Sequence, residues 1–170
     1  MHKLRDAPGE TEAGLKARLE GVAGKSKVYV LGLGNTDRAD DGAGVLVAEA
    51  LKKLFPSYSY SEHDGVEGTV LDISEKDGDI IVFFVDASEL HAPPGTVRVI
   101  EKERIRETEI TTHRVAVALM ASMLEKAGKK AAVVGIQPGR IEFMGTVTAP
   151  VRAAIGTVTK SLANLMRAND

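Results

Sequence analysis

Residues 79–87, DIIVFFVDA, constrain the fold of this chain more than any other segment. Six apolar residues follow one another without interruption and end at an aspartate. The run lacks the alternation of a half-buried strand and is too short for a buried helix. It is typical of a central strand in a parallel sheet, which is buried on both faces. A parallel neighbour requires a crossover connection, usually a helix, so the segment predicts an α/β fold.

The rest of the chain alternates between strand and helix patterns. Further strands are expected at 27–33, 58–63, 96–103 and 131–138, and helices at 11–22, 42–55, 112–128 and 149–168. The strand at 58–63 is the most polar and is expected near an edge. The predicted buried stripes are Val47, Leu51 and Leu54 in the second helix, Val115, Leu119, Met123 and Leu124 in the third, and Val151, Ile155, Val158, Leu162 and Leu165 in the fourth. We therefore predict a three-layer α/β sandwich with a twisted, mainly parallel five-stranded sheet and helices on both faces.

The 170 residues suit one compact domain. Leu15, Leu19 and Val22 recur at helical spacing ahead of the first strand, and Gly24 follows them. We interpret residues 1–24 as an N-terminal helical extension and residues 25–170 as a single α/β domain.

Composition excludes several classes of function. With 22 Lys and Arg against 24 Asp and Glu, the net charge of -2 argues against nucleic acid as the main partner. The chain has no cysteine, which excludes disulfides, thiolate metal sites and a cysteine nucleophile. No apolar run approaches ~20 residues, and the first residues lack the apolar segment of a signal peptide. We expect a soluble, cytoplasmic protein without a membrane partner.

Acidic side chains and a histidine occur where ligands of such sheets bind, beyond the carboxyl ends of the strands. Asp41 follows the first strand, Asp86 ends the central strand, and His113 opens the helix at 112–128. These residues are far apart in the sequence but can converge on one edge of the sheet. Two carboxylates and one imidazole suit a borderline divalent ion such as zinc or nickel. The pattern predicts a metal site.

The glycine-rich turn GLGNTDRADDGAG (32–44) resembles a phosphate-binding loop only superficially. A phosphate at a helix N-terminus is held by backbone N–H groups and the positive end of the helix dipole. Asp40 and Asp41 would occupy that end and repel a phosphate, whereas they attract a cation. The turn also lacks the G-x-G-x-x-G pattern of dinucleotide-binding proteins.

Each carboxylate also has a plainer interpretation. Asp40 or Asp41 could cap the following helix, and Asp86 could be a turn residue. A carboxylate directly after IIVFFV lies beside a buried core, where a charge needs a partner. That position favours a functional role for Asp86.

The histidines leave a similar choice. His113 could be a surface residue or a helix cap, and a lone histidine is more often structural than a ligand. His63, which follows a strand, and His91, in the turn HAPPG, are competing candidates.

Four sequence blocks follow one another along the chain: GLGNTDRADDGAG (32–44), VDASELHAPPGTVRVI (85–100), TTHRVAVALMASML (111–124) and GIQPGRIEFMGTVTAPVRAAI (135–155). In this order they resemble the hydrogenase maturation endopeptidases, which remove a C-terminal peptide from the precursor of the nickel–iron hydrogenase large subunit. The similarity covers roughly residues 27–165, and four blocks in one order are far more specific than GLGN alone. The resemblance implies the three-layer α/β fold predicted above. It also implies that the domain is a nickel-dependent protease.

The resemblance implies that Asp41, Asp86 and His113 contact nickel and act in catalysis, with Asp40 a candidate base by proximity. The precursor is the implied partner and supplies the nickel, so that cleavage depends on nickel insertion. The same ligands would accept another divalent ion such as zinc or cadmium. Glu89 stands where relatives often have aspartate.

Two alternatives remain open. A non-catalytic, nickel-dependent assembly chaperone on the same fold would use the same ligands. Peptidyl-tRNA hydrolase also begins with a strand and GLGN, but it continues with Asn-Pro-Gly. Here Thr36 and Asp37 follow Asn35 in an acidic loop, which disfavours that alternative.

Overall fold

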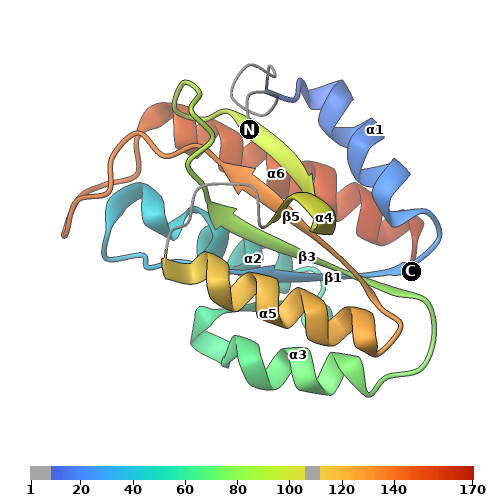
Figure 1. The fold of residues 1–170 in the computed structure, drawn as a ribbon. Helices are drawn as coiled ribbons and strands as arrows, with labels where there is room; N and C mark the ends of the chain where they lie inside the picture. Colours follow the sequence, from blue (N-terminus) through green and yellow to red (C-terminus); the bar gives the residue numbers. More distant parts are fainter. Residues whose placement is uncertain (1–8, 106–111) are drawn as a thin grey trace.

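The computed structural model describes residues 9–105 and 112–170, with the backbone alone at 112–114. Figure 1 shows the arrangement of the elements. They are α1 (Glu12–Ala23), β1 (Lys27–Gly32), η1 (Ala39–Gly42), α2 (Ala43–Lys52), β2 (Ser59–Ser61), η2 (Glu62–Asp64), α3 (Val66–Ser74), β3 (Ile80–Ala87), β4 (Val97–Glu101), α4 (Lys102–Ile105), α5 (Thr112–Lys126), β5 (Lys130–Ile136) and α6 (Ala149–Ala168), where η denotes a short 3-10 helix.

The five strands form one sheet in the order β2-β1-β3-β5-β4. Strands β2, β1, β3 and β5 are parallel, and β4 pairs antiparallel with β5 at one edge. All eight residues of β3 are buried between its two neighbours. The predicted central strand at 79–87 and the predicted edge strand at 58–63 are therefore both confirmed.

Helices cover both faces of the sheet, as predicted. In Figure 1, α1 and α6 lie above the sheet, and α5 and α3 lie below it. Apolar residues of α1, α2 and α6 share one core with one face of the strands. Those of α3, α4 and α5 form a second core on the opposite face. The three-layer α/β sandwich is confirmed.

The closing helix α6 has the predicted buried face. Pro150 lies in its first turn, and Val151, Val158, Leu162 and Leu165 are buried, while Ile155 is half-buried. Its opposite face carries exposed charged side chains, so the helix is amphipathic rather than apolar all round. Across residues 9–105 and 112–170, no helix combines the length and hydropathy that crossing a membrane requires.

The predicted buried stripe of α5 is wrong in part. Val115 and Leu119 are 65% and 64% exposed. The residues that face the sheet are Val117, Met120, Ala121 and Leu124. Apolar residues occur around much of this helix, so periodicity alone allowed two stripes, and packing against β5 and α3 selected one of them.

Two further differences concern α2 and α3. Leu54 was expected in the buried stripe of α2, but the helix ends at Lys52 and Leu54 is 56% exposed. Helix α3 was not predicted, because two glycines and several carboxylates obscure its short apolar pattern. Val66, Val70 and Ile73 nevertheless point into the core at helical spacing.

The first helix packs on the domain. Thr11 caps α1 by accepting a hydrogen bond from the Gly14 N–H at 3.0 Å, and Gly24 ends the helix. Leu15, Leu19 and Ala23 are buried against α6 and β4. The division into an extension and a protease domain stays a prediction, but α1 contributes directly to the core.

Candidate metal and catalytic site

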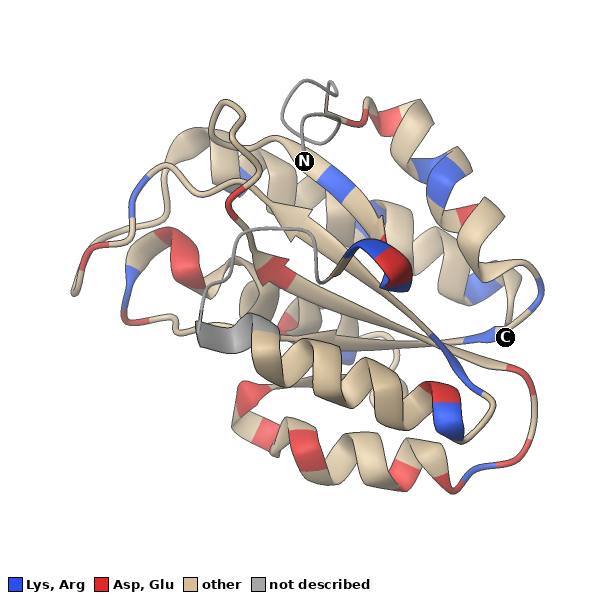
Figure 2. Cartoon of the chain, in the orientation of Figure 1, with Lys and Arg blue, Asp and Glu red and all other residues tan. Residues whose placement is uncertain are grey.

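The order of the strands makes a topological switch point between β1 and β3, where open α/β sheets form a crevice. From β1 the chain crosses to β2 on one side, and from β2 it returns to β3 on the other side. In open α/β sheets, ligands bind at such a switch point, beyond the carboxyl ends of the strands. Asp41, in η1 after β1, and Asp86, near the end of β3, flank it. Figure 2 shows acidic residues at the end of β3 and in the segment ahead of α2.

Asp86 is buried on the face of the sheet that α5 covers. Its side chain is in register with Gly135 of β5, and Arg98 of β4 is in register with the same glycine. Registered residues present their side chains to one face. Asp86 and Arg98 are only 5% and 8% exposed. A carboxylate and a guanidinium therefore share one buried row across three strands.

The loop between β1 and α2 fixes the position of Asp41. Gly34 has a φ of 125°, and a Cβ atom there would overlap the carbonyl oxygen of Asp41. Only glycine allows this approach. The Asp41 N–H donates to the Arg38 carbonyl at 3.1 Å, and η1 contacts β3. Half-buried Asp41 is thereby held beside the end of β3.

Gly44 sets the distance between α2 and the sheet. A Cβ atom at this position would overlap the carbonyl oxygens of Val85 and Leu33. The first turn of α2 thus lies directly on the ends of β3 and β1. Because Val85 precedes Asp86, this contact also fixes η1 relative to Asp86.

Position 113 reaches the same edge through the chain topology. The short turn from α5 into β5 makes the helix antiparallel to that strand, so α5 begins at the carboxyl edge of the sheet. The backbone of His113 lies in this first turn, and its side chain is outside the described residues. Among the side chains that are described, no three His, Cys, Asp or Glu residues gather closely enough to hold a metal. The set of Asp41, Asp86 and His113 stays a prediction.

The side chain of Asp40 is buried and joins the loop after β1 to the loop between β5 and α6. Its Oδ2 accepts hydrogen bonds from the N–H groups of Gly139 and Arg140 at 2.8 and 2.9 Å and from the Thr148 hydroxyl at 2.8 Å. Its Oδ1 accepts from the Thr148 N–H at 2.7 Å. Burial raises the pKa of Asp40, but the hydrogen bonds from Thr148, Arg140 and Gly139 outweigh it and hold the pKa below its usual 3.8. These contacts give Asp40 a structural role, while a role as base stays a prediction.

Replacing Asp40 by asparagine should lower the melting temperature. The NH₂ group of the asparagine must then face at least one N–H donor, so one or more charge-assisted hydrogen bonds are lost. This loss should lower the free energy of unfolding by about 2–3 kcal/mol. For a domain of this size that is a fall of about 4–12 °C at neutral pH. Calorimetry of both proteins measures it. An unchanged melting temperature would contradict the anchoring role.

The melting temperatures of wild type and Asp40→Asn should also differ in their dependence on pH. The folded-state pKa of Asp40 is lowered, so its stabilisation is present above the unfolded pKa near 3.8 and is lost as pH falls through the folded value. The difference in melting temperature between wild type and Asp40→Asn should therefore shrink below about pH 4. A constant difference down to pH 2 would contradict this assignment.

The structure also bears on the alternative roles of Asp40 and Asp41 as helix caps and on the competing histidines. Neither Asp40 nor Asp41 caps a helix, since η1 and α2 both lack a side-chain capping bond. His63 is exposed in η2, after β2. His91 is exposed after β3, with Nδ1 3.7 Å from a Glu89 carboxylate oxygen.

Two buried polar residues support the loop after Asp86, and sequence reasoning gave neither of them a role. The Gln137 Oε1 accepts from the Leu90 N–H at 2.6 Å, and its Nε2 donates to Glu89 at 3.2 Å. The Arg98 Nη1 donates to the Leu90 carbonyl at 2.7 Å. In TVRVIEKE, Arg98 alternates with Val97 and Val99 and so falls on the face of the strand opposite to these valines, which gave no signal that it is buried.

Comparison with known proteins decides the family. The family model described as hydrogenase maturation protease matches residues 67–165. The chain belongs to this family. Asp86 and position 113 fall inside the matched segment, and Asp41 lies before it. The resemblance to the hydrogenase maturation endopeptidases is thereby confirmed, and three of the four sequence blocks lie inside the matched segment.

Individual members of the maturation protease family are similar to this chain over most of its length. The hydrogenase 3 maturation protease of Escherichia coli K12 is 30% identical over 137 residues, which cover 78% of this chain and 86% of that protein. The crystal structure of the NiFe hydrogenase maturation protease HycI from Thermococcus kodakarensis KOD1 has a TM-score of 0.74 at 26% identity, covering 88% of this chain and 99% of that one. The hydrogenase maturating endopeptidase HybD from E. coli has a TM-score of 0.65 at 25% identity, covering 84% and 93%.

Proposed function

We propose that this protein is an endopeptidase that removes the C-terminal peptide of a nickel–iron hydrogenase large-subunit precursor after nickel insertion, and that it recognises the bound nickel. The observation that carries the proposal is the placement of Asp41 and Asp86 on the two sides of the β1–β3 switch point, with the first turn of α5 at the same edge. Membership of the maturation protease family supports it.

Charge supplies the selectivity in this proposal. Two carboxylates that face one crevice repel each other, and a dication between them converts repulsion into attraction. Nickel arrives as part of the substrate, bound by the precursor, and Asp41, Asp86 and His113 complete its ligand set. A precursor without nickel brings no such charge and binds weakly. Cleavage then reports that nickel has been inserted.

A metal at this position also serves the chemistry of cleavage. A bound dication can polarise a carbonyl oxygen or lower the pKa of a bound water. In this proposal the residues of this chain hold the peptide end against that ion. Cytosolic precursors would meet the enzyme directly, which matches the expected cytoplasmic location.

The deciding experiment mixes the purified protein with candidate large-subunit precursors, with and without nickel, and measures the precursor mass. We expect loss of a C-terminal peptide in the nickel-loaded sample only. Equal cleavage of both samples would contradict nickel recognition. Nickel-dependent binding without any change of mass would contradict the protease and favour an assembly chaperone.

A further inference from the structure

An apolar loop tip projects beside the candidate site. Ile141, Phe143 and Met144, which we call the apolar tip, lie between β5 and α6 and are 42%, 72% and 80% exposed. Large apolar side chains this exposed and this close together usually mark a contact with another molecule. Within the part of the chain that the structure describes, they contribute to neither core.

The loop that carries the apolar tip is rigidly anchored. Asp40 holds Gly139, Arg140 and Thr148 on either side of the tip through four hydrogen bonds. The Asp40 N–H also donates to the Arg140 carbonyl at 3.0 Å. A loop held in this way presents its side chains in a fixed arrangement and loses little entropy on binding.

A further bond holds the tip residue itself. The Met144 N–H donates to the Asp37 carbonyl at 2.8 Å, and Met144 has a φ of 61°. A non-glycine residue in this left-handed region is uncommon and is kept only where its surroundings fix it. The structure therefore maintains a backbone strain that holds an 80% exposed methionine outward.

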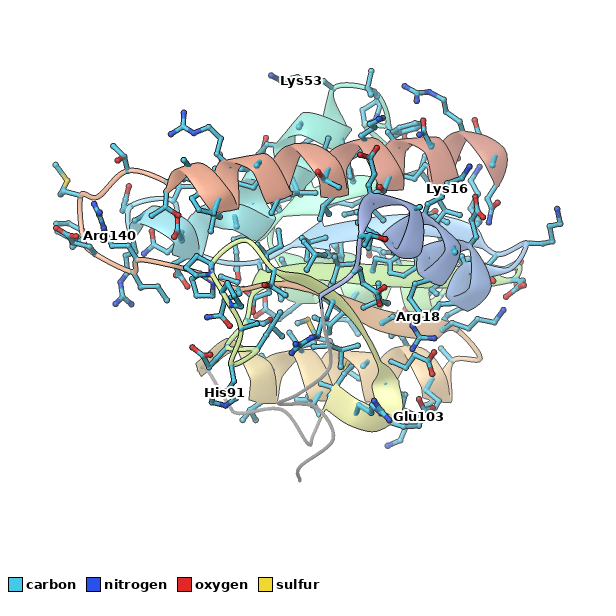
Figure 3. All side chains as sticks on the ribbon, turned by 90° about the horizontal axis from the view of Figure 1, so that it is seen from above. Lys16, Arg18, Lys53, His91, Glu103 and Arg140 are labelled. Carbon is cyan, nitrogen blue, oxygen red and sulfur yellow. The ribbon has the colours of Figure 1, made fainter. Side chains whose placement is uncertain are left out.

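The tip lies next to the proposed metal ligands. Its anchors, Asp37 and Asp40, belong to the same short loop as Asp41. Figure 3 shows Arg140 at the end of the molecule where His91 also lies, whereas Lys16 of α1 lies toward the opposite end. A chain end that reaches Asp41 therefore comes close to the residues that anchor this loop.

The charge and size of the patch indicate the kind of contact. Arg140 precedes the tip and Glu142 lies within it. The Arg140 Nε is 3.6 Å from a Glu142 carboxylate oxygen, so the two charges balance and the tip offers apolar rather than electrostatic contact. Three side chains cover a few hundred Å² at most, well below the roughly 800 Å² per partner of a stable interface. The patch suits part of a transient contact, such as that between an enzyme and a protein substrate, better than a permanent dimer.

We propose that the apolar tip is a docking element that inserts into an apolar pocket on the folded body of the precursor, independently of nickel. The proposal rests on the proposed function and adds a second point of recognition to it. In this proposal Asp41 and Asp86 recognise the nickel, and the apolar tip binds the surface of the precursor polypeptide.

The test compares Phe143→Ser/Met144→Ser with wild type in processing of the nickel-loaded precursor. Exposed apolar anchors dominate such contacts, so we expect KM to rise at least about tenfold while kcat changes less than about twofold. Affinity for the nickel-free precursor, measured by biolayer interferometry, should fall by the same factor. Leu54→Ser is the matched control, because Leu54 is 56% exposed beside Lys53, away from Arg140 in Figure 3.

Each other outcome overturns the proposal. An unchanged KM, or a fall in kcat with KM unchanged, would mean that the tip does not dock the precursor. Sedimentation that shows a wild-type dimer and a monomeric variant would assign the tip to self-association. If wild type processes no precursor, the proposed function fails and the docking role fails with it, whereas normal processing by the tip variant removes the docking role alone.

Discussion

Asp86→Asn should abolish nickel-dependent processing while leaving the protein folded. The substitution keeps the size of the side chain and removes the charge that would face nickel in the proposed site. Partners that merely support a metal ligand cost 10–100-fold when they are replaced, so loss of a direct ligand should cost at least about 100-fold. Mass spectrometry of the nickel-loaded precursor measures the loss.

The affinity of Asp86→Asn for the loaded and the nickel-free precursor shows whether Asp86 is a metal ligand or only a structural residue. Binding of the loaded precursor should fall in Asp86→Asn, and binding of the nickel-free precursor should not. Asp72→Asn, which alters an exposed carboxylate on α3, is the control and should behave as wild type. Full processing by Asp86→Asn would remove this residue from the proposed site.

Gly44→Ala should destabilise the protein strongly and disable the site. The added methyl group overlaps the Val85 and Leu33 carbonyl oxygens, and rigid backbone on both sides cannot move away cheaply. Overpacking typically costs about 1–3 kcal/mol, and against rigid backbone we expect the upper end, which is a fall in melting temperature of about 6–12 °C. Displacement of α2 would also move Asp41 away from β3, so processing should be lost.

Gly156→Ala is the matched control for this change. Gly156 lies within α6, and no atom comes within 4 Å of a Cβ built there. Alanine favours a helix over glycine by about 1 kcal/mol, so the control should melt a few degrees higher than wild type. Equal melting temperatures for the two variants would contradict the steric explanation for Gly44.

Most of the framework could be predicted from the sequence. An uninterrupted apolar run predicts a strand buried on both faces, and β3 is such a strand. The more polar run at 58–63 predicts an edge, where β2 lies. These patterns are local, because burial on both faces requires apolar residues at consecutive positions whatever the neighbours are.

Sequence reasoning was weaker where several packings fit one pattern. Val115 and Leu119 form an apolar stripe as regular as the buried one, and only contact with β5 and α3 decides between them. Leu54 was misplaced for a different reason, because α2 ends at Lys52 and its predicted end lay three residues too far along the chain.

The candidate site shows the same division. The positions of acidic residues after β1 and near the end of β3 could be predicted from the sequence, since a charge after an apolar run lies at a strand end. Only the tertiary structure distinguished the two adjacent aspartates. Asp40 turns inward because its donors, Gly139, Arg140 and Thr148, lie 99 to 108 residues further along the chain. Folding alone brings those N–H groups to the carboxylate, so no local pattern could reveal that Asp40 anchors the loop while Asp41 stays half-buried.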